Sequence, residues 1–194
     1  MTQTLHIKNM VCPRCIKAVR EVLTSSGLNV RRVELGEAEV EAPTAELDLK
    51  AIDKELRDNG FELLIDKGKQ RVEQIKVALI EYVNGLATAD QPERVSSYLA
   101  KNLQSPYTQL SKLFSRYVGQ TIEKHLILLK IERVKELLSY GELTLSEIAY
   151  RLHYSSVQHL STQFKHVTGL SVSEYKNLGI SHRHPLDAIP FMQP

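Results

Sequence analysis

The fold of this chain is decided by a stretch that occurs twice, as LAKNLQSPYTQLSKLFSRYVGQT over residues 99–121 and as IAYRLHYSSVQHLSTQFKHVTGLS over residues 148–171. The Leu-Ala pair that opens the first copy recurs as Ile-Ala 49 residues later, whereas the leucine, phenylalanine and glycine of its second half recur 50 residues later. The second copy therefore has one additional residue, between Leu152 and Leu160. A repeat of this kind indicates one supersecondary unit that the chain uses twice.

Each copy has the pattern of a short helix, a tight turn and a second helix. In the second copy, Thr144 and Glu147 predict a capping box at the start of the short helix, and Gly169 predicts a left-handed residue at the end of the second helix. Ser155 and Gln158 predict another capping box, at the start of the second helix. The apolar residues expected to face the core of this copy are Ile148, Ala149, Leu152, Leu160, Phe164 and Val167.

The first copy carries the corresponding signals. Asp90 and Glu93 predict the cap of its opening helix, with Pro92 in the first turn, where no amide donor is needed. Ser105 and Pro106 predict the start of its second helix. The residues of that helix expected to be buried or to cap its end are Leu110, Phe114, Tyr117 and Gly119.

Two helices joined by such a turn form a helix-turn-helix, whose second helix fits the major groove of DNA. A helical hairpin without a role in DNA binding is the alternative, but two units at constant spacing with polar outer faces favour the helix-turn-helix. Residues 122–139 predict one continuous helix between the copies, roughly 27 Å long at a rise of about 1.5 Å per residue. Such a rod would let both second helices enter successive major-groove segments, which repeat about every 34 Å.

The first 66 residues have a different pattern, in which alternating apolar residues mark strands and helical spacing marks two helices. The expected order is strand 4–8, a helix from Cys15 to Gly27, strand 28–35, strand 38–42 closed by Pro43, a helix from Leu49 to Asn59, and strand 61–65. Arg31 and Arg32 break the alternation of the second strand, which indicates a β-bulge. This βαββαβ order predicts a ferredoxin-like fold.

Cys12 and Cys15 are the two cysteines of the chain, and they lie in the loop MVCPRC, residues 10–15, ahead of the first helix. In an intracellular chain such a pair favours metal or redox chemistry over a structural disulfide. The helix start, Arg14 and Lys17 all favour ionised thiols. Without a third cysteine or a nearby histidine, two thiolates favour Cu(I) or another soft metal ion over Zn(II). A redox pair and a vestigial site are the alternatives.

This part of the chain resembles the heavy-metal-associated domain of copper chaperones and copper ATPases. The resemblance lies in the order of the elements, in the MxCxxC motif of Met10, Cys12 and Cys15, and in the Gly-Phe pair at 60–61. It implies that the two cysteines bind the metal and that the methionine packs beneath the loop. Loops of that family usually carry glycine before the methionine, where this chain has Asn9.

Residues 70–178 resemble the DNA-binding domain of AraC/XylS-type transcription regulators, in FSRYVGQTIEKHL, KIERVKELL, LTLSEIAYRLHYSS and FKHVTGLSVSEYK. The resemblance implies double-stranded DNA at an operator or promoter as the partner, and a DNA-binding domain that requires no cofactor. It leaves a homodimer and a contact with RNA polymerase open as further partners. Turns of this kind usually carry glycine where this chain has Gln104 and His153, and a left-handed residue other than glycine costs about 1 kcal/mol.

Ten polar side chains are expected on the outer faces of the two second helices, where they could contact DNA. They are Thr108, Gln109, Ser111, Lys112 and Arg116 in the first copy and Gln158, His159, Ser161, Thr162 and Lys165 in the second. Near the start of such a helix glutamine can pair with adenine, and lysine with guanine. The three basic residues lie farther along, where phosphate contacts are expected as well. A solvated surface is the alternative for any one of them.

These patterns together predict an α+β ferredoxin-like, heavy-metal-associated domain over residues 1–67. An all-α AraC-type domain with two helix-turn-helix units joined by a long helix follows over residues 70–178. Residues 179–194, with His182 and His184, predict a disordered tail. The net charge of the chain is only +2, and residues 70–178 carry +3, which suits phosphate contact without proving it.

The function expected from the sequence is a cytoplasmic, sequence-specific transcription regulator that responds to a soft metal ion such as Cu(I). A metal carrier, or a regulator with a redox-sensing or vestigial cysteine pair, is the alternative. An enzyme is not expected, because neither a phosphate-binding loop nor a nucleophile–base pair is found. Membrane association and secretion are not expected either, because the chain lacks a run of about 18 apolar residues and an apolar signal segment near its start.

Overall fold

The computed structural model describes residues 2–41 and 47–177. The chain divides into two compact units, Met1–Val77 and Ala78–Pro194, which are called the first and the second unit below. Pro43 and the predicted disordered tail over residues 179–194 lie outside the described residues. Among the helices of the described ranges, none is both long enough and apolar enough to span a membrane.

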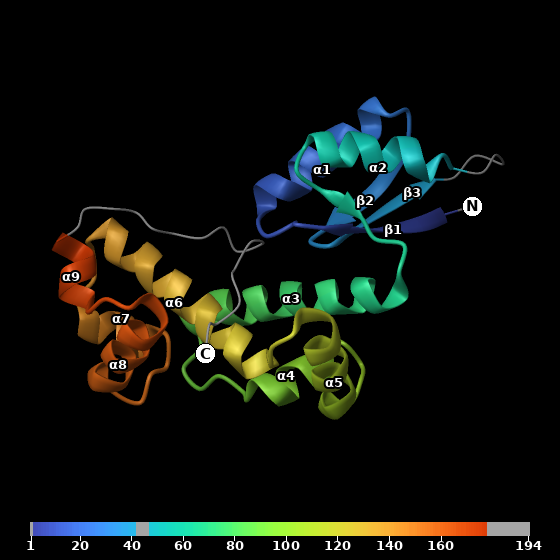
Figure 1. The fold of residues 1–194 in the computed structure, drawn as a ribbon. Helices are drawn as coiled ribbons and strands as arrows, with labels where there is room; N and C mark the ends of the chain where they lie inside the picture. The colour runs from blue at the N-terminus through green and yellow to red at the C-terminus, as the bar shows by residue number, and fades with distance from the viewer. Residues whose placement is uncertain (1, 42–46, 178–194) are drawn as a thin grey trace. The chain divides into compact units, whose positions relative to one another are not determined.

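The first unit contains a four-stranded antiparallel sheet with two helices on one face (Figure 1). Its elements are β1 (Thr2–Lys8), α1 (Pro13–Ser25), β2 (Asn29–Glu34), β3 (Glu37–Glu41), α2 (Leu49–Asp58) and β4 (Glu62–Leu63). The strand order is β2-β3-β1-β4. Alternate residues of the strands, such as Leu5 and Ile7, share one buried core with Val19 of α1 and Leu56 of α2. The order of the elements is the one that the alternating pattern predicts.

Local signals in the first unit place its turns and its irregularities. The register between β2 and β3 shifts between Val30 and Arg32, so the predicted bulge is confirmed. Gly36 has a φ of 85° and turns the chain between these two strands. Asp48 caps α2, because its carboxylate accepts hydrogen bonds from the amides of Lys50 and Ala51 at 3.1 Å.

The last strand is shorter than the sequence predicts. Only Glu62 and Leu63 pair with β1, and the Leu64 amide then donates to the carbonyl of His6 at 2.8 Å. Beyond this bond the chain leaves the sheet, so Ile65 is 73% exposed although the alternation predicts a strand residue there. Helix α3 (Lys67–Leu86) begins two residues later, and the two compact units divide within this helix.

The second unit is helical, with two short helix pairs on either side of a long helix (Figure 1). The first pair is α4 (Val95–Asn102) and α5 (Tyr107–Val118), the long helix is α6 (Ile122–Tyr140), and the second pair is α7 (Leu145–Arg151) and α8 (Val157–Thr168), followed by α9 (Val172–Asn177). Phe114 and Phe164 are fully buried at equivalent positions of α5 and α8. The long helix predicted between the two copies is also confirmed, because α6 is one continuous helix of 19 residues.

The backbone of the two helix pairs repeats closely. Gly119 and Gly169 end α5 and α8, and both have a φ of 77°. Gln104 and His153, at φ 47° and 50°, are the left-handed residues of the two turns. The predicted capping box of Thr144 with Glu147 is present at the start of α7.

Three of the predicted helix starts in the second unit are wrong. Helix α8 is capped by Ser156 instead of Ser155, and α5 begins after Pro106 instead of at it. Helix α4 begins only at Val95, well beyond the expected cap at Asp90. The carbonyl of Glu93 accepts a hydrogen bond from the Tyr82 hydroxyl at 2.8 Å, and this contact holds the segment in its non-helical path.

The buried face of α5 also differs from the prediction at its last turn. Tyr117 is 43% exposed, although the spacing predicts a buried side chain. The apolar stripe steps by four residues from Leu110 to Phe114 and then to Val118, which is half-buried. Tyr117 therefore lies at the edge of this stripe.

Candidate nucleic-acid interface and thiol pair

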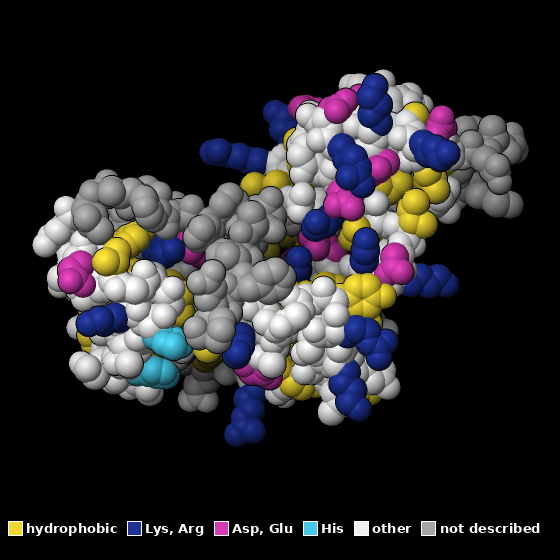
Figure 2. Space-filling model, viewed as in Figure 1, with side chains coloured by type: hydrophobic (Ala, Val, Ile, Leu, Met, Phe, Trp, Pro, Cys, Tyr) yellow, Lys and Arg dark blue, Asp and Glu magenta, His cyan; other side chains and the backbone are white. Residues whose placement is uncertain are grey.

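The outer faces of α5 and α8 carry the ten predicted polar residues. Eight are exposed and the two serines, Ser111 and Ser161, are half-buried. The structure thus brings five of them together on each helix, opposite Phe114 and Phe164. Figure 2 shows lysine and arginine side chains dispersed over the visible face among acidic ones, which agrees with the small net charge.

The first turn of α8 holds its side chains through a set of polar and aromatic contacts. The hydroxyl of Ser156 accepts a hydrogen bond from the His159 amide at 3.0 Å. The ring of His159 is 2.9 Å from the Ser155 hydroxyl through Nδ1, and it meets the ring of Tyr154 edge-on at 5.5 Å between centroids. The Tyr154 hydroxyl donates to Oε1 of Gln163 at 2.8 Å. Sequence reasoning missed the roles of Tyr154, Ser155 and Gln163.

The first turn of α5 is held differently. Its N-cap is Pro106, whose side chain has no hydrogen-bonding atom. The Tyr107 hydroxyl instead donates to the carboxylate of Glu123 at the start of α6. Burial raises the pKa of the Tyr107 hydroxyl, and the hydrogen bond to Glu123 raises it further. The same hydrogen bond lowers the pKa of Glu123. Within the described residues the Gln109 side chain has no hydrogen-bond partner.

Helix α6 touches the turn of the second pair through Lys130. Its ammonium group lies 4.2 Å from the centre of the Tyr154 ring. Burial lowers the pKa of Lys130 to about 8, because the charged form loses hydration. Burial also raises the pKa of Tyr154. The tyrosine that contacts His159 and Gln163 is thus itself packed against the central helix.

The turn of the second pair also contacts the end of α3. Nε2 of His153 is 3.1 Å from the carbonyl oxygen of Leu86 and 2.9 Å from that of Ala89. Because both partners are acceptors, Nε2 is the protonated nitrogen and donates to them. His153 therefore combines a left-handed backbone with a side-chain bond that glycine could not make.

Cys12 is the N-cap of α1 and Cys15 lies in the first turn of this helix, because α1 begins at Pro13, two residues before the start that the sequence predicts. Their sulfur atoms are 3.5 Å apart, and both side chains are half-buried. Burial by itself raises the pKa of the Cys12 thiol, but hydrogen bonds from the amide and thiol of Cys15 and from the Arg14 amide outweigh it, so the pKa is lowered. Met10 is fully buried in the core beneath the loop.

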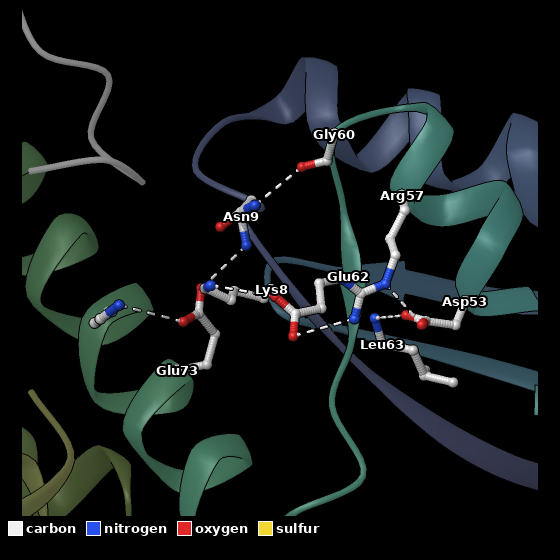
Figure 3. Close-up of polar contacts among 9 residues, drawn as sticks. Lys8, Asn9, Asp53, Arg57, Gly60, Glu62, Leu63 and Glu73 are labelled. Carbon is white, nitrogen blue, oxygen red and sulfur yellow. Dashed lines mark hydrogen bonds and ion pairs between the residues drawn. The ribbon is translucent and has the colours of Figure 1, made fainter. Parts of the chain in front are cut away.

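The loop before the thiols is anchored by a buried carboxylate (Figure 3). Asn9 is left-handed with a φ of 73°, and its amide donates to Oε1 of Glu73 in α3 at 3.2 Å. Its side chain donates to the carbonyl of Gly60 at 3.0 Å. Asparagine tolerates this conformation better than most residues, and these two bonds hold it there. The role of Glu73 could not be seen in the sequence.

The thiol pair offers a metal ion two ligands. In the part of the chain that the structure describes, no group of three or more His, Cys, Asp or Glu side chains could hold a metal ion. Four-coordinate zinc normally takes more protein ligands than this, whereas a soft ion accepts two thiolates. Two sulfur atoms 3.5 Å apart can both reach one ion, so this pair fits a soft ion.

Two comparisons with known proteins found similarities to this chain. Residues 99–178, which include both helix pairs, match the family model of a helix-turn-helix domain. Among solved structures, the chain is similar to the C-terminal domain of AraT, a response regulator from Geobacillus stearothermophilus, with 23% sequence identity and a TM-score of 0.48. This similarity covers 58% of the present chain and 88% of the AraT chain. Curated protein sequences contain no match.

Proposed function

We propose that the protein is a DNA-binding transcription regulator that inserts α5 and α8 into the major groove of double-stranded DNA. The observation that carries this proposal is the duplicated helix pair, whose second helices present polar residues on exposed faces. The match of residues 99–178 to a helix-turn-helix domain supports the same function. In such domains the first turn of the second helix contacts base edges.

The proposal assigns roles to six of the ten polar residues by their place along each helix. Gln109, Gln158 and His159 lie in the first turns, where side chains reach base edges. Lys112, Arg116 and Lys165 lie farther along and would neutralise phosphates, which gives affinity without sequence information.

Selection of binding sites from random double-stranded DNA, repeated at several salt concentrations, tests this function. We expect one enriched sequence, and an affinity that falls as salt rises because counterions are released. Lys112→Ala should weaken binding to all sequences, and it should lower by about 1 the slope of the logarithm of the binding constant against the logarithm of the salt concentration. Gln158→Ala should instead change the preferred base at one position. Failure to enrich any sequence at any salt concentration would contradict the proposal.

We further propose that Cys12 and Cys15 bind a soft metal ion such as Cu(I), and that loading of this site changes the affinity for DNA. The short distance between the sulfur atoms, the lowered pKa of Cys12 and the two-ligand donor set support this chemistry. The resemblance of the cysteine loop to heavy-metal-associated domains supports it as well. A metal carrier without a response at DNA is the other outcome that the test can give.

The metal proposal is tested by titrating the selected DNA with the wild type and with the double variant Cys12→Ser/Cys15→Ser, each with and without Cu(I). We expect Cu(I) to change the affinity of the wild type alone, and Mg²⁺, a hard ion, to change neither. Because linkage is reciprocal, DNA should change the affinity for Cu(I) by the same factor. Equal DNA affinities in all four samples would remove the metal response and leave the DNA-binding function intact.

A further inference from the structure

The residue that distinguishes the second helix pair from the first can be identified from the backbone. The amides of Ser105 and Tyr154, 49 residues apart, each donate to an alanine carbonyl of the preceding helix. Pro106 and Ser156, 50 residues apart, are the N-caps of α5 and α8. The spacing changes between these two pairs, so the additional residue is Ser155.

This additional residue touches a side chain on the exposed face of α8. Oγ of Ser155 is 2.9 Å from Nδ1 of His159, which is the third residue of the helix and is exposed. The Tyr154 ring packs against the same imidazole with an angle of 83° between the planes. The hydrogen bond at Nδ1 and the T-shaped contact with Tyr154 together fix the orientation of the ring.

We propose that Ser155 is a positioning residue, which fixes His159 so that its Nε2–H donates a hydrogen bond to N7 of a guanine in the major groove. This inference rests on the proposed DNA binding by α8. When the serine hydroxyl donates to Nδ1, the proton of the neutral imidazole is on Nε2. A protonated imidazole presents the same Nε2–H.

The chemistry of the groove favours guanine as the partner of this donor. Guanine presents two acceptors there, N7 and O6, whereas adenine places an amino donor beside its N7. A nitrogen that only donates therefore suits guanine better than adenine. The equivalent residue of α5 is Gln109, whose amide both donates and accepts and which has no side-chain partner among the described residues. The two copies should therefore prefer different bases at this position, because an amide suits adenine.

The test compares the full-length wild type with Ser155→Ala, Ser155→Thr and His159→Ala, with Ser173→Ala on α9 as an exposed serine control. Binding sites are selected for each protein, and affinities are then measured with guanine replaced by 7-deazaguanine at single positions. Circular dichroism of each variant reports whether the helices are retained.

We expect the wild type and Ser155→Thr to prefer guanine at one position by about tenfold and to lose this preference with 7-deazaguanine there. Ser155→Ala and His159→Ala should lose the preference at that position alone and keep their affinity for other sequences. If Ser155→Ala keeps the full preference, or 7-deazaguanine has no effect at any position, the inference is wrong while DNA binding stands. If the wild type selects no sequence, the proposed function fails as well.

Discussion

The left-handed turn residues Gln104 and His153 are equivalent in the two helix pairs, yet we expect glycine to have opposite effects at them. Relief of the left-handed conformation stabilises by roughly 1–2 kcal/mol, while the greater freedom of glycine in the unfolded chain costs about 0.5–1 kcal/mol. Within the described residues, the Gln104 side chain makes no hydrogen bond. Gln104→Gly should therefore raise the free energy of unfolding by about 0.5–1 kcal/mol.

At His153 the same backbone gain is outweighed by lost side-chain contacts. The imidazole Nε2–H is shared between the carbonyls of Leu86 and Ala89, and its removal costs about 0.5–1.5 kcal/mol. Loss of the packing of a half-buried ring costs about 1 kcal/mol more. His153→Gly should therefore lower the free energy of unfolding by about 1 kcal/mol, which separates the two glycine variants by about 1.5–2 kcal/mol.

Urea unfolding followed by far-ultraviolet circular dichroism measures this difference, provided that the denaturant slopes of the variants agree. His153→Asn is the matched control, because asparagine tolerates the left-handed conformation but cannot place an imidazole nitrogen against the end of α3. Its free energy of unfolding should be lower than that of the wild type, because the lost imidazole bonds outweigh the small backbone gain of asparagine. A His153→Gly variant as stable as Gln104→Gly would show that the bonds to Leu86 and Ala89 contribute nothing.

Two further predictions concern the central helix and the cap of α7. Burial lowers the pKa of Lys130 to about 8 from its ordinary value of 10.5, so between these pH values the unfolded chain binds more protons than the folded protein. The stability of the wild type relative to Lys130→Met should therefore rise, on the order of 2 kcal/mol, as the pH increases through this window. A constant difference across the window would contradict the lowered pKa. Thr144→Ala removes the capping box with Glu147 and should cost about 1 kcal/mol in urea unfolding, whereas Thr144→Ser should cost little.

The features that the sequence predicts correctly depend on chemistry within a few residues. Thr144 and Glu147 are three residues apart, and nothing distant is needed for each to bond the other's amide. Gly119 and Gly169 end their helices because glycine enters the left-handed region without a steric cost. The bulge near Arg32 follows from the break in alternation of a single strand.

The errors arise where a distant group decides between local alternatives. Asp90 and Glu93 have the spacing of a capping box, but the hydroxyl of Tyr82 binds the carbonyl of Glu93 and the helix begins later. Ile65 fits the alternation of a strand, yet the chain has already left the sheet at that point. A pattern within one segment carries no information about such partners.

The candidate sites show the same division. The sequence locates the thiol pair and the ten polar residues, because both follow from spacing within one helix or loop. It does not reveal that Glu73, 64 residues from Asn9, anchors the loop before the thiols. It also gives only an indirect sign of Ser155, in the change of the repeat spacing from 49 to 50 residues.

The two helix pairs have diverged in their side chains and hardly in their backbone. Both turns are left-handed at the same place, and both second helices end at a glycine of the same φ. The start of α5 is held by a bond from Tyr107 to Glu123 of α6, whereas the start of α8 is held by Ser155 and Ser156 from its own turn. The helix starts are therefore one place where the exposed side chains of α5 and α8 are held differently. The additional residue of the second pair contributes to this difference, because Ser155 places a hydroxyl 2.9 Å from Nδ1 of His159.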